Sequence, residues 1–455
     1  MDIRTTMRPL NQIAARLDAG EPSLALIDEC LGRIKDPAGE GGRTYLKVYA
    51  ERARIEAEAF DALRRGGGAP TRFAGIPVSI KDLFDVAGEV TTSGSIALRD
   101  APPAPRDASV IARLRGAGFV PMGRTNMTEF AFSGLGINPH YDTPRNPYDR
   151  KTGRIPGGSS SGAATSVTDG MAAAGLGTDT GGSCRIPAAL CGIAGWKPTA
   201  LRIPTDGVMP LSQSLDSVGV MAPTVTCCAI VDAVLAGGAP AGVPEFPLAG
   251  LRLAVPQRVV LESLDQDVSR AFGAALSALS RAGARISEIA LREFAELGQV
   301  NAKGGFVCAE AYAVHRPLMK VKAKDYDPFV LTRIQRGKEQ DAADYIELMW
   351  TRADMIRRLN AVTAPYDALV MPTVPMIAPT LRELEDADAA RHANALLLRN
   401  TVIANFFDRC AVSIPCHKAG EAPVGLMLMG ENGGDRRLLA IAAAMETLVA
   451  PALAA

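Results

Sequence analysis

The sequence predicts an α/β fold built on a substantially parallel or mixed β-sheet. Short apolar segments of strand length alternate with segments of helical periodicity, and this alternation continues along most of the chain from about residue 73. The chain has 455 residues, 47% of them hydrophobic, which is enough to bury a large core. Length alone suggests two or three domains, but α/β enzymes of this size often form one unit.

The first 65 residues are expected to form helical scaffold. Apolar residues from Leu24 to Ile34 recur at helical spacing, with Ser23 as the expected N-terminal cap. A second helix is expected over residues 45–65, and Gly66 would end it.

Strands and helices then alternate. The expected strands are residues 75–82, 119–123, 171–179, 251–257, 285–291, 366–375, 410–416 and 424–430. The expected helices are residues 107–118, 159–170, 265–284, most of 300–362, and 435–449. The Pro/Gly-rich segment 237–250 is interpreted as a surface loop inside one domain.

Composition excludes several classes of function. The formal net charge is zero and no Lys/Arg-rich block occurs, so neither nucleic acid nor an anionic membrane is an expected partner. No signal peptide and no run of 18 apolar residues is found, so a soluble, cytoplasmic protein is expected. The eight cysteines are interpreted as buried free thiols, in preference to a metal site at Cys410, Cys416 and His417.

Two glycine–serine clusters raise the question of a nucleophile. Residues 158–162 match the GxSxG pattern of a nucleophile elbow, which needs a strand before the serine and a histidine base. A loop precedes this serine, and neither His392 nor His417 lies in a recognisable context, so the match is interpreted as accidental.

In the second cluster, Gly181 and Gly182 directly precede Ser183. Consecutive glycines allow backbone N–H groups to converge on a developing oxyanion, although a tight turn between strands is the structural alternative. A serine nucleophile also needs a base. Lys81 follows an apolar run, where burial would lower its pKa by the ~3 units that a base at neutral pH requires. The alternative, a surface ion pair of Lys81 with Asp82 or Asp85, stays open at this point.

Taken together, these motifs resemble the amidase signature family. Residues 157–167 and 175–199 are similar to the family's signature block, and residues 75–82 to its lysine motif. The resemblance extends over about residues 20–447. It implies one domain over 1–455, with a single large mixed sheet surrounded by helices. Its parts would be a helical segment (1–70), a core with the catalytic residues (71–230), and the rest of the sheet with the cover of the substrate cavity (231–455).

The resemblance also implies roles for individual residues. Ser183 would be the acylated nucleophile, Ser159 the bridging serine with a cis peptide bond, and Lys81 the general base. The oxyanion hole would use backbone N–H groups of four consecutive residues: Thr180, Gly181, Gly182 and Ser183. No metal or organic cofactor is implied.

Several residues receive weaker predictions. Met127, Phe132 and Arg185 are candidate substrate contacts. For Arg185, a structural ion pair with an acid such as Asp179 is the favoured alternative. Ser160 would either hydrogen-bond near the relay or cap a helix, and Trp196 is expected in the core.

The implied function is a stand-alone serine hydrolase of a small-molecule amide or carbamate, with esters as further substrates and a homodimer as an open possibility. The scarcity of charge around the motifs favours an apolar or aromatic acyl group. The alternative is the A subunit of a tRNA-dependent amidotransferase, which releases ammonia from glutamine. A catalytically dead binding protein is disfavoured, because Lys81, Ser159 and Ser183 are all present.

Overall fold

The computed structural model describes residues 6–451, and in this range eleven strands form one mixed sheet. The strand order is β1-β3-β2-β4-β6-β5-β10-β11-β9-β7-β8. β2 pairs in parallel with β3 and β4, and β7 with β8 and β9, while the remaining pairs are antiparallel. The predicted fold class, an α/β protein with one large mixed sheet, is therefore confirmed. The strands are β1 (Tyr45–Val48), β2 (Pro77–Lys81), β3 (Val120–Thr125), β4 (Ala174–Thr178), β5 (Ala194–Lys197), β6 (Val218–Ala222), β7 (Arg252–Pro256), β8 (Arg285–Ile289), β9 (Ala368–Pro372), β10 (Ala411–Pro415) and β11 (Gly425–Met429).

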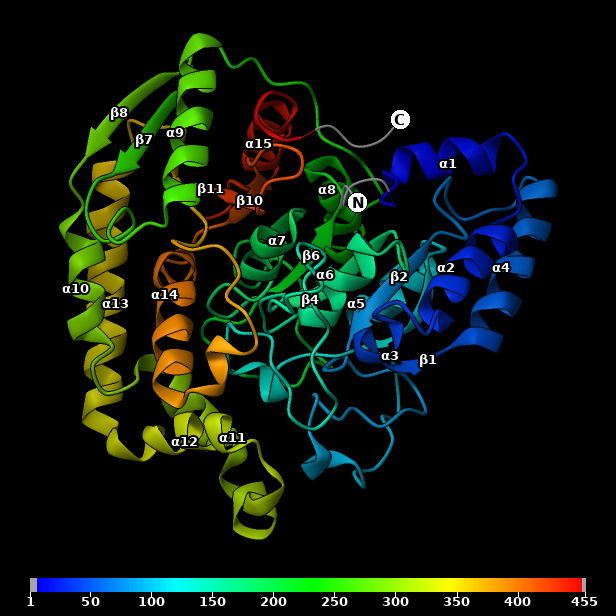
Figure 1. Cartoon of the computed structure of the whole chain (residues 1–455), viewed down its shortest axis with the longest axis horizontal. Coiled ribbons are helices and arrows are strands. Elements are labelled where there is room, and N and C mark those ends of the chain that lie inside the picture. Colours follow the sequence, from blue (N-terminus) through cyan, green and yellow to red (C-terminus); the bar gives the residue numbers. More distant parts are fainter. Residues whose placement is uncertain (1–5, 452–455) are drawn as a thin grey trace.

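Helices surround the sheet, with α1, α2 and α4 at one end of the molecule and α10 and α13 at the other (Figure 1). The helices are α1 (Leu10–Asp18), α2 (Ser23–Lys35), α3 (Gly41–Thr44), α4 (Ala50–Arg65), α5 (Ser109–Gly116), α6 (Ser161–Thr168), α7 (Arg185–Cys191), α8 (Val225–Leu235), α9 (Gln266–Arg281), α10 (Arg292–Val300), α11 (Gly305–Lys322), α12 (Pro328–Gln335), α13 (Ala342–Thr363), α14 (Ala387–Phe406) and α15 (Asp435–Val449). Short 3-10 turns occupy Ile96–Leu98, Glu129–Ala131, Ala323–Asp325, Arg336–Glu339 and Glu383–Glu385.

The N-terminal helices differ from the sequence prediction in two details. The segment expected to be helical from residue 45 begins instead as strand β1, which pairs antiparallel with β3 at the edge of the sheet, and α4 starts only at Ala50. Ser23 is the first residue of α2 and does not cap it: its hydroxyl donates to the carbonyl of Gly75 at 2.6 Å. The carboxylate of Asp61 accepts the N–H groups of Ser23, at 2.7 Å, and Leu24 at this helix start.

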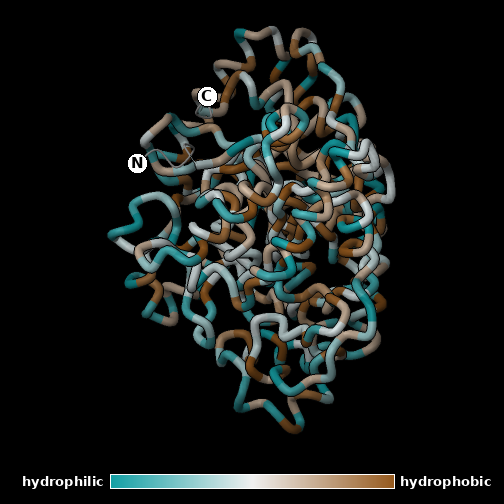
Figure 2. The backbone as a smooth tube through the Cα atoms, turned by 90° about the vertical axis from the view of Figure 1, so that its right-hand side faces the viewer, coloured by the Kyte–Doolittle hydropathy of each residue, from teal (hydrophilic) through white to brown (hydrophobic). Residues whose placement is uncertain are grey.

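The middle of the sheet is buried on both faces, because helices cover it. Every residue of β2, β4, β5 and β6 is buried, as expected for strands that read as continuous apolar runs. In Figure 2 the hydrophobic segments gather inside the molecule and the hydrophilic ones at its margin. Trp196 on β5 is fully buried and donates to Asp232, so its predicted place in the core is confirmed.

The Pro/Gly-rich segment 237–250 forms a connection without helix or strand between α8 and β7. The strands before and after it belong to the same sheet. All eight cysteines are buried and free, as predicted. Among residues 6–451, no helix combines the length and the apolar character needed to cross a membrane.

Candidate active site

The site begins where two parallel strands end side by side. Lys81 is the last residue of β2, and Thr178 is the last residue of the neighbouring strand β4. The carboxyl ends of parallel strands meet at the same edge of a sheet, so the two side chains lie together. The Nζ of Lys81 donates to Oγ1 of Thr178 at 2.9 Å and to Oγ of Ser159 at 2.8 Å.

Lys81 is completely buried. Removal from water disfavours its charged form and lowers its pKa to about 8, although the negative charges of Asp179 and Asp216 act in the opposite direction. The surface ion pair considered for Lys81 is not what the structure contains, since Asp82 pairs with Arg124 instead. The environment of Lys81 is that of a lysine that gives up its proton near neutral pH.

Ser159 lies in a tight loop just before α6. The Gly158–Ser159 peptide bond is cis. A side chain at Gly158 would come within 2.5 Å of the backbone nitrogen of Gly136, so this close approach requires glycine. A loop, not a strand, precedes the serines of the GxSxG match, and the Ser160 hydroxyl bonds to the carbonyl of Thr178 at 3.4 Å. Ser160 occupies the N-cap position of α6 but makes no side-chain capping bond.

Ser183 lies in the turn between β4 and α7, and it lines a cavity although only 4% of its surface is exposed. The preceding Gly182 has a φ of 133°. A side chain there would come within 2.2 Å of Oγ1 of Thr401. Glycine at this position thus allows helix α14, which carries Thr401, to pack directly on the turn.

The backbone N–H groups of the turn divide into two sets. Those of Gly182 and Cys184 donate to the carboxylate of Asp179, at 2.9 and 3.1 Å. Within residues 6–451, the N–H groups of Thr180, Gly181 and Ser183 have no protein acceptor. Of the four N–H groups expected to act as oxyanion donors, three therefore have no acceptor among the described residues, whereas that of Gly182 donates to Asp179.

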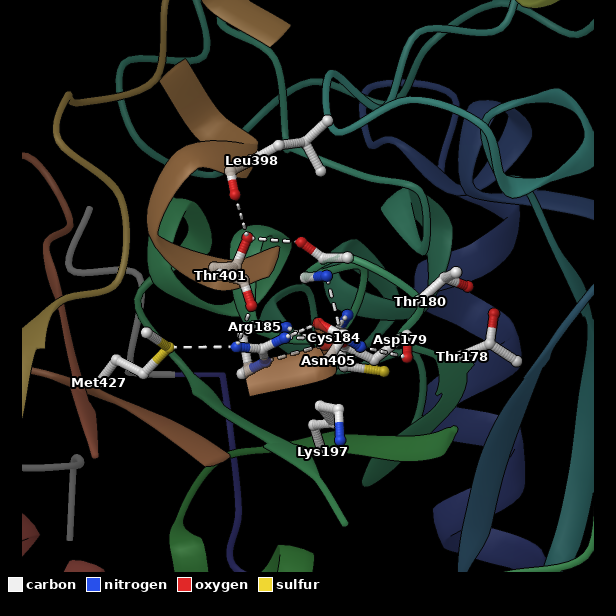
Figure 3. Close-up of polar contacts among 12 residues, drawn as sticks. Thr178, Asp179, Thr180, Cys184, Arg185, Lys197, Leu398, Thr401, Asn405 and Met427 are labelled. Atoms are coloured by element: carbon white, nitrogen blue, oxygen red, sulfur yellow. Dashed lines mark hydrogen bonds and ion pairs between the residues drawn. The ribbon is translucent and has the colours of Figure 1, made fainter. Parts of the chain in front are cut away.

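Asp179 is held by an ion pair with Arg185, at 2.8 Å between Oδ1 and an Nη atom. Burial alone would raise the pKa of Asp179, but Arg185 outweighs it and lowers the pKa to about 2. Arg185 also donates to the carbonyl of Thr401 and to Asn405 on α14, so the turn and the helix are tied together (Figure 3). Arg185 is fully buried and does not line the cavity, so it takes the ion-pair role and is not in a position to contact substrate.

The cavity in front of Ser183 has a volume of about 660 Å³. Thr180 and Gly181 contribute to its wall, and Phe132 is the one of the three candidate contacts that lines it. Met127 is fully buried elsewhere and does not reach the lining. The other walls come from α10, α11, α12 and α14, and include the aromatic rings of Phe294, Phe306 and Phe406.

Sequence reasoning missed two parts of this arrangement. The hydroxyl of Thr178 accepts a second hydrogen bond from the Nζ of Lys81. The only sequence signal for this role is the place of Thr178 near the end of a predicted strand. Three arginines of the cavity wall were not singled out: Arg333 and Arg336 lie in the segment 300–362, which was expected to be mostly helical, and Arg399 lies on α14, a helix that was not predicted. Nothing in their local pattern indicates which face of the helix they occupy.

Comparison with known proteins places this fold and site in a family. The family model described as Amidase matches residues 25–439, so the chain belongs to the amidase family. It is therefore a hydrolase of carbon–nitrogen bonds.

The chain is 36% identical to the 2-amino-5-chloromuconic acid deaminase of Comamonas testosteroni, covering 97% of this chain and 96% of the relative. It is 33% identical to the A subunit of the glutamyl-tRNA(Gln) amidotransferase of Roseiflexus sp. (strain RS-1), covering 92% and 91%. A crystal structure of an amidase superposes with a TM-score of 0.87 at 30% identity, covering 97% of this chain and all of the other.

Proposed function

We propose that this protein is a stand-alone serine hydrolase of small-molecule amides, with Ser183 as nucleophile, Ser159 as proton relay and Lys81 as general base. The observation that carries the proposal is the buried hydrogen bond from Lys81 to Ser159, next to a turn that presents Ser183 to the cavity. A lysine with a pKa near 8 and a hydroxyl partner has the two properties that a base for a serine nucleophile needs.

Acylation starts from neutral Lys81. The lysine nitrogen takes the proton of the Ser159 hydroxyl while Ser159 takes that of Ser183, and the Ser183 oxygen forms a bond to the carbonyl carbon. The free N–H groups of Thr180, Gly181 and Ser183 stabilise the oxyanion, and one such donor typically contributes roughly 3 kcal/mol. The C–N bond then breaks as the proton returns through Ser159 to the leaving nitrogen, and the amine departs.

Deacylation reverses the relay. Water gives its proton through Ser159 to Lys81 and attacks the acyl carbon, and the bond to Ser183 breaks as the serine recovers a proton. The product is a carboxylic acid, and Lys81 is neutral again. Carbamates and esters are further proposed substrates, because both present a carbonyl to the same nucleophile and an alkoxide leaves more easily than an amine.

The second candidate function is that of the A subunit of an amidotransferase, and the 33% identity to the Roseiflexus protein favours it. In that case glutamine would be the substrate and turnover would require a partner subunit. The two candidates share the Lys81, Ser159 and Ser183 chemistry and differ in their dependence on a partner.

The deciding experiment measures amine or ammonia release by the purified chain alone, on p-nitroanilides, aryl carbamates, primary amides and glutamine. A 2-aminomuconic acid belongs in the panel because of the deaminase relative. We expect turnover that disappears in Ser183→Ala, together with fluorophosphonate labelling of the wild type and not of the variant. Glutaminase activity that appears only beside a partner subunit would favour the second candidate. Turnover retained by Ser183→Ala would refute the assigned nucleophile.

A further inference from the structure

Asp216 lies in the loop before β6 and connects this loop to the turn that carries Ser183. One oxygen of its carboxylate, Oδ1, accepts the hydroxyl of Thr180 at 2.5 Å. The other oxygen, Oδ2, accepts the backbone N–H groups of Leu211 and Ser212, at 3.0 and 3.1 Å. Hydrogen bonds to an ionised acceptor are shorter and stronger than those between neutral groups. The carboxylate therefore ties the first residue of the turn to the loop.

The loop is also held by helix α11. The carboxylate of Glu310 on α11 accepts the hydroxyls of Ser212 and Ser214 and the backbone N–H of Ser214. The position of Asp216 is thus fixed by bonds that do not involve Thr180. The bond between the two residues consequently restrains Thr180 and not the loop.

The two peptide groups on either side of Thr180 are held differently. The carbonyl of Asp179 accepts the N–H of Ser217 at 3.2 Å and the side-chain amide of Asn405 at 2.9 Å. In a trans peptide the N–H points away from the carbonyl, so these two bonds fix the direction of the Thr180 N–H. The carbonyl of Thr180 shares its peptide group with the N–H of Gly181, and it has no hydrogen-bond donor within residues 6–451.

The direction of the Gly181 N–H therefore depends on the conformation of Thr180. Gly181 has no side chain whose packing could hold this peptide group, and glycine adds conformational freedom to the turn. Among the described residues, Asp216 is the acceptor for the Thr180 hydroxyl. This one side-chain bond is what restrains the peptide group between the two residues.

We propose that Asp216 is a positioning residue, which holds the Thr180 hydroxyl and thereby keeps the N–H groups of Thr180 and Gly181 directed at the oxyanion. This inference rests on the proposed serine chemistry. Asp216 does not line the cavity, so it would act through Thr180 and not on the substrate. Donors that are aligned before the reaction need no reorganisation when the negative charge develops.

The test removes the hydroxyl and keeps the shape of the side chain. Thr180→Val should lower kcat for an anilide about 10- to 100-fold, less than the loss of a whole oxyanion donor. KM should change little, because the oxyanion exists only in the transition state. Thr180→Ser keeps the hydroxyl and should retain most of kcat. Asp216→Asn should lower kcat at least as much as Thr180→Val, because its amide turns a donor toward either Thr180 or the loop N–H groups.

The matched control is Thr199→Val. The Thr199 hydroxyl also donates to a carboxylate, that of Asp435 at 2.7 Å, but Thr199 does not line the cavity. This variant loses the same kind of bond away from the turn, and we expect its kcat to be unchanged. A kcat of Thr180→Val equal to that of the wild type would overturn the proposal. An equal loss of kcat in Thr199→Val would overturn it as well.

The pH profile separates the charge of Asp216 from its positioning role. Burial lowers the pKa of Lys81, whereas the negative charge of Asp216 raises it. The other groups that act on Lys81, Cys184 and Asp179, are the same in both variants. Asp216→Asn should therefore move the inflection of kcat/KM to lower pH, while Thr180→Val should leave it in place. The same shift in both variants would mean that they act by disturbing Lys81, and the positioning role would be wrong.

Failure of this inference and failure of the proposed function give different results. If the wild type shows no turnover that depends on Ser183, the proposed chemistry fails and the positioning role fails with it. If the wild type turns over through Ser183 and Thr180→Val does so at the same rate, only the role of Asp216 is wrong. Should Asp216→Asn not fold, the comparison of Thr180→Val and Thr180→Ser with the wild type decides.

Discussion

At the scale of single residues, two lysines are buried within residues 6–451, and their surroundings differ. Burial lowers the pKa of both Lys81 and Lys197 to about 8. Lys197 donates to the backbone carbonyls of Pro198 and Arg409, which have no proton to give. Lys81 donates to two hydroxyl groups, which can both accept and donate. The partners, and not the pKa, mark Lys81 as the candidate base.

This difference predicts a pH profile. Only neutral Lys81 accepts a proton, so below its pKa of about 8 the active fraction falls as pH falls. We expect kcat/KM for an anilide to rise about tenfold per pH unit up to roughly pH 8 and then to level off. The measurement is a pH–rate profile of the wild type and of Lys197→Met, which should keep the same inflection. A profile that is flat from pH 6 to 9, or an inflection lost in Lys197→Met, would contradict the role of Lys81.

Candidate site residues could be predicted where the neighbouring residues in the sequence indicate the local structure. The glycines before Ser183 and the apolar run before Lys81 indicated an oxyanion turn and a buried lysine. The occupation of the Gly182 N–H by Asp179 was not predictable, because it depends on how the turn folds back on one carboxylate. The position of Arg333 was not predictable either, since it depends on how α12 packs across the cavity.

At the scale of elements, the turn that carries Ser183 is held between β4 and α14. The Asp179 carboxylate accepts two N–H groups of the turn, and Arg185 connects this carboxylate to Thr401 and Asn405 of α14. Asn405 also donates to the carbonyl of Asp179 at 2.9 Å. The geometry of the proposed oxyanion donors therefore depends on a helix more than 200 positions away in the sequence.

Removing Arg185 should be strongly destabilising. Arg185→Met leaves the buried Asp179 charge without its partner, which typically costs about 3–5 kcal/mol. Asp179→Asn/Arg185→Met should recover part of this loss, because it removes the uncompensated charge. The free energy of unfolding in urea measures both. The control is Arg391→Met, which breaks an exposed pair with Asp388 and should cost less than about 1 kcal/mol. A cost for Arg185→Met no larger than that of the control would refute the proposed role of Arg185 in holding Asp179 and α14 together.

Periodicity predicted most helices and strands because burial of one face or of both faces is a local property of the sequence. The strand β1 was missed because its four residues precede a strongly helical segment, and only pairing with β3 at the sheet edge makes them a strand. The order of the strands was not predictable from the residues themselves. It depends on contacts such as β5 with β10, whose residues are more than 200 positions apart.

At the scale of the whole molecule, hydrogen bonding between strands continues across the loop at 237–250. The strands before the loop, β1 to β6, form one half of the sheet and the strands after it, β7 to β11, form the other half. The two halves are joined where β5 pairs with β10. The last helix, α15, packs against α8 and α9, which precede and follow the loop. One hydrophobic cluster includes residues from Leu10 to Met445. This arrangement supports the prediction of a single domain.

A single domain should unfold as one cooperative unit, and the two tryptophans allow a test. Trp196 is buried in β5, before the loop, whereas Trp350 on α13 is 70% exposed. In Trp350→Phe, tryptophan fluorescence reports only on the core before the loop, while circular dichroism reports on all helices. We expect the two thermal transitions to coincide, because the paired strands cannot separate without exposing the shared core. Two transitions at different temperatures would mean that the segments before and after the loop unfold independently, and the single-domain prediction would be wrong.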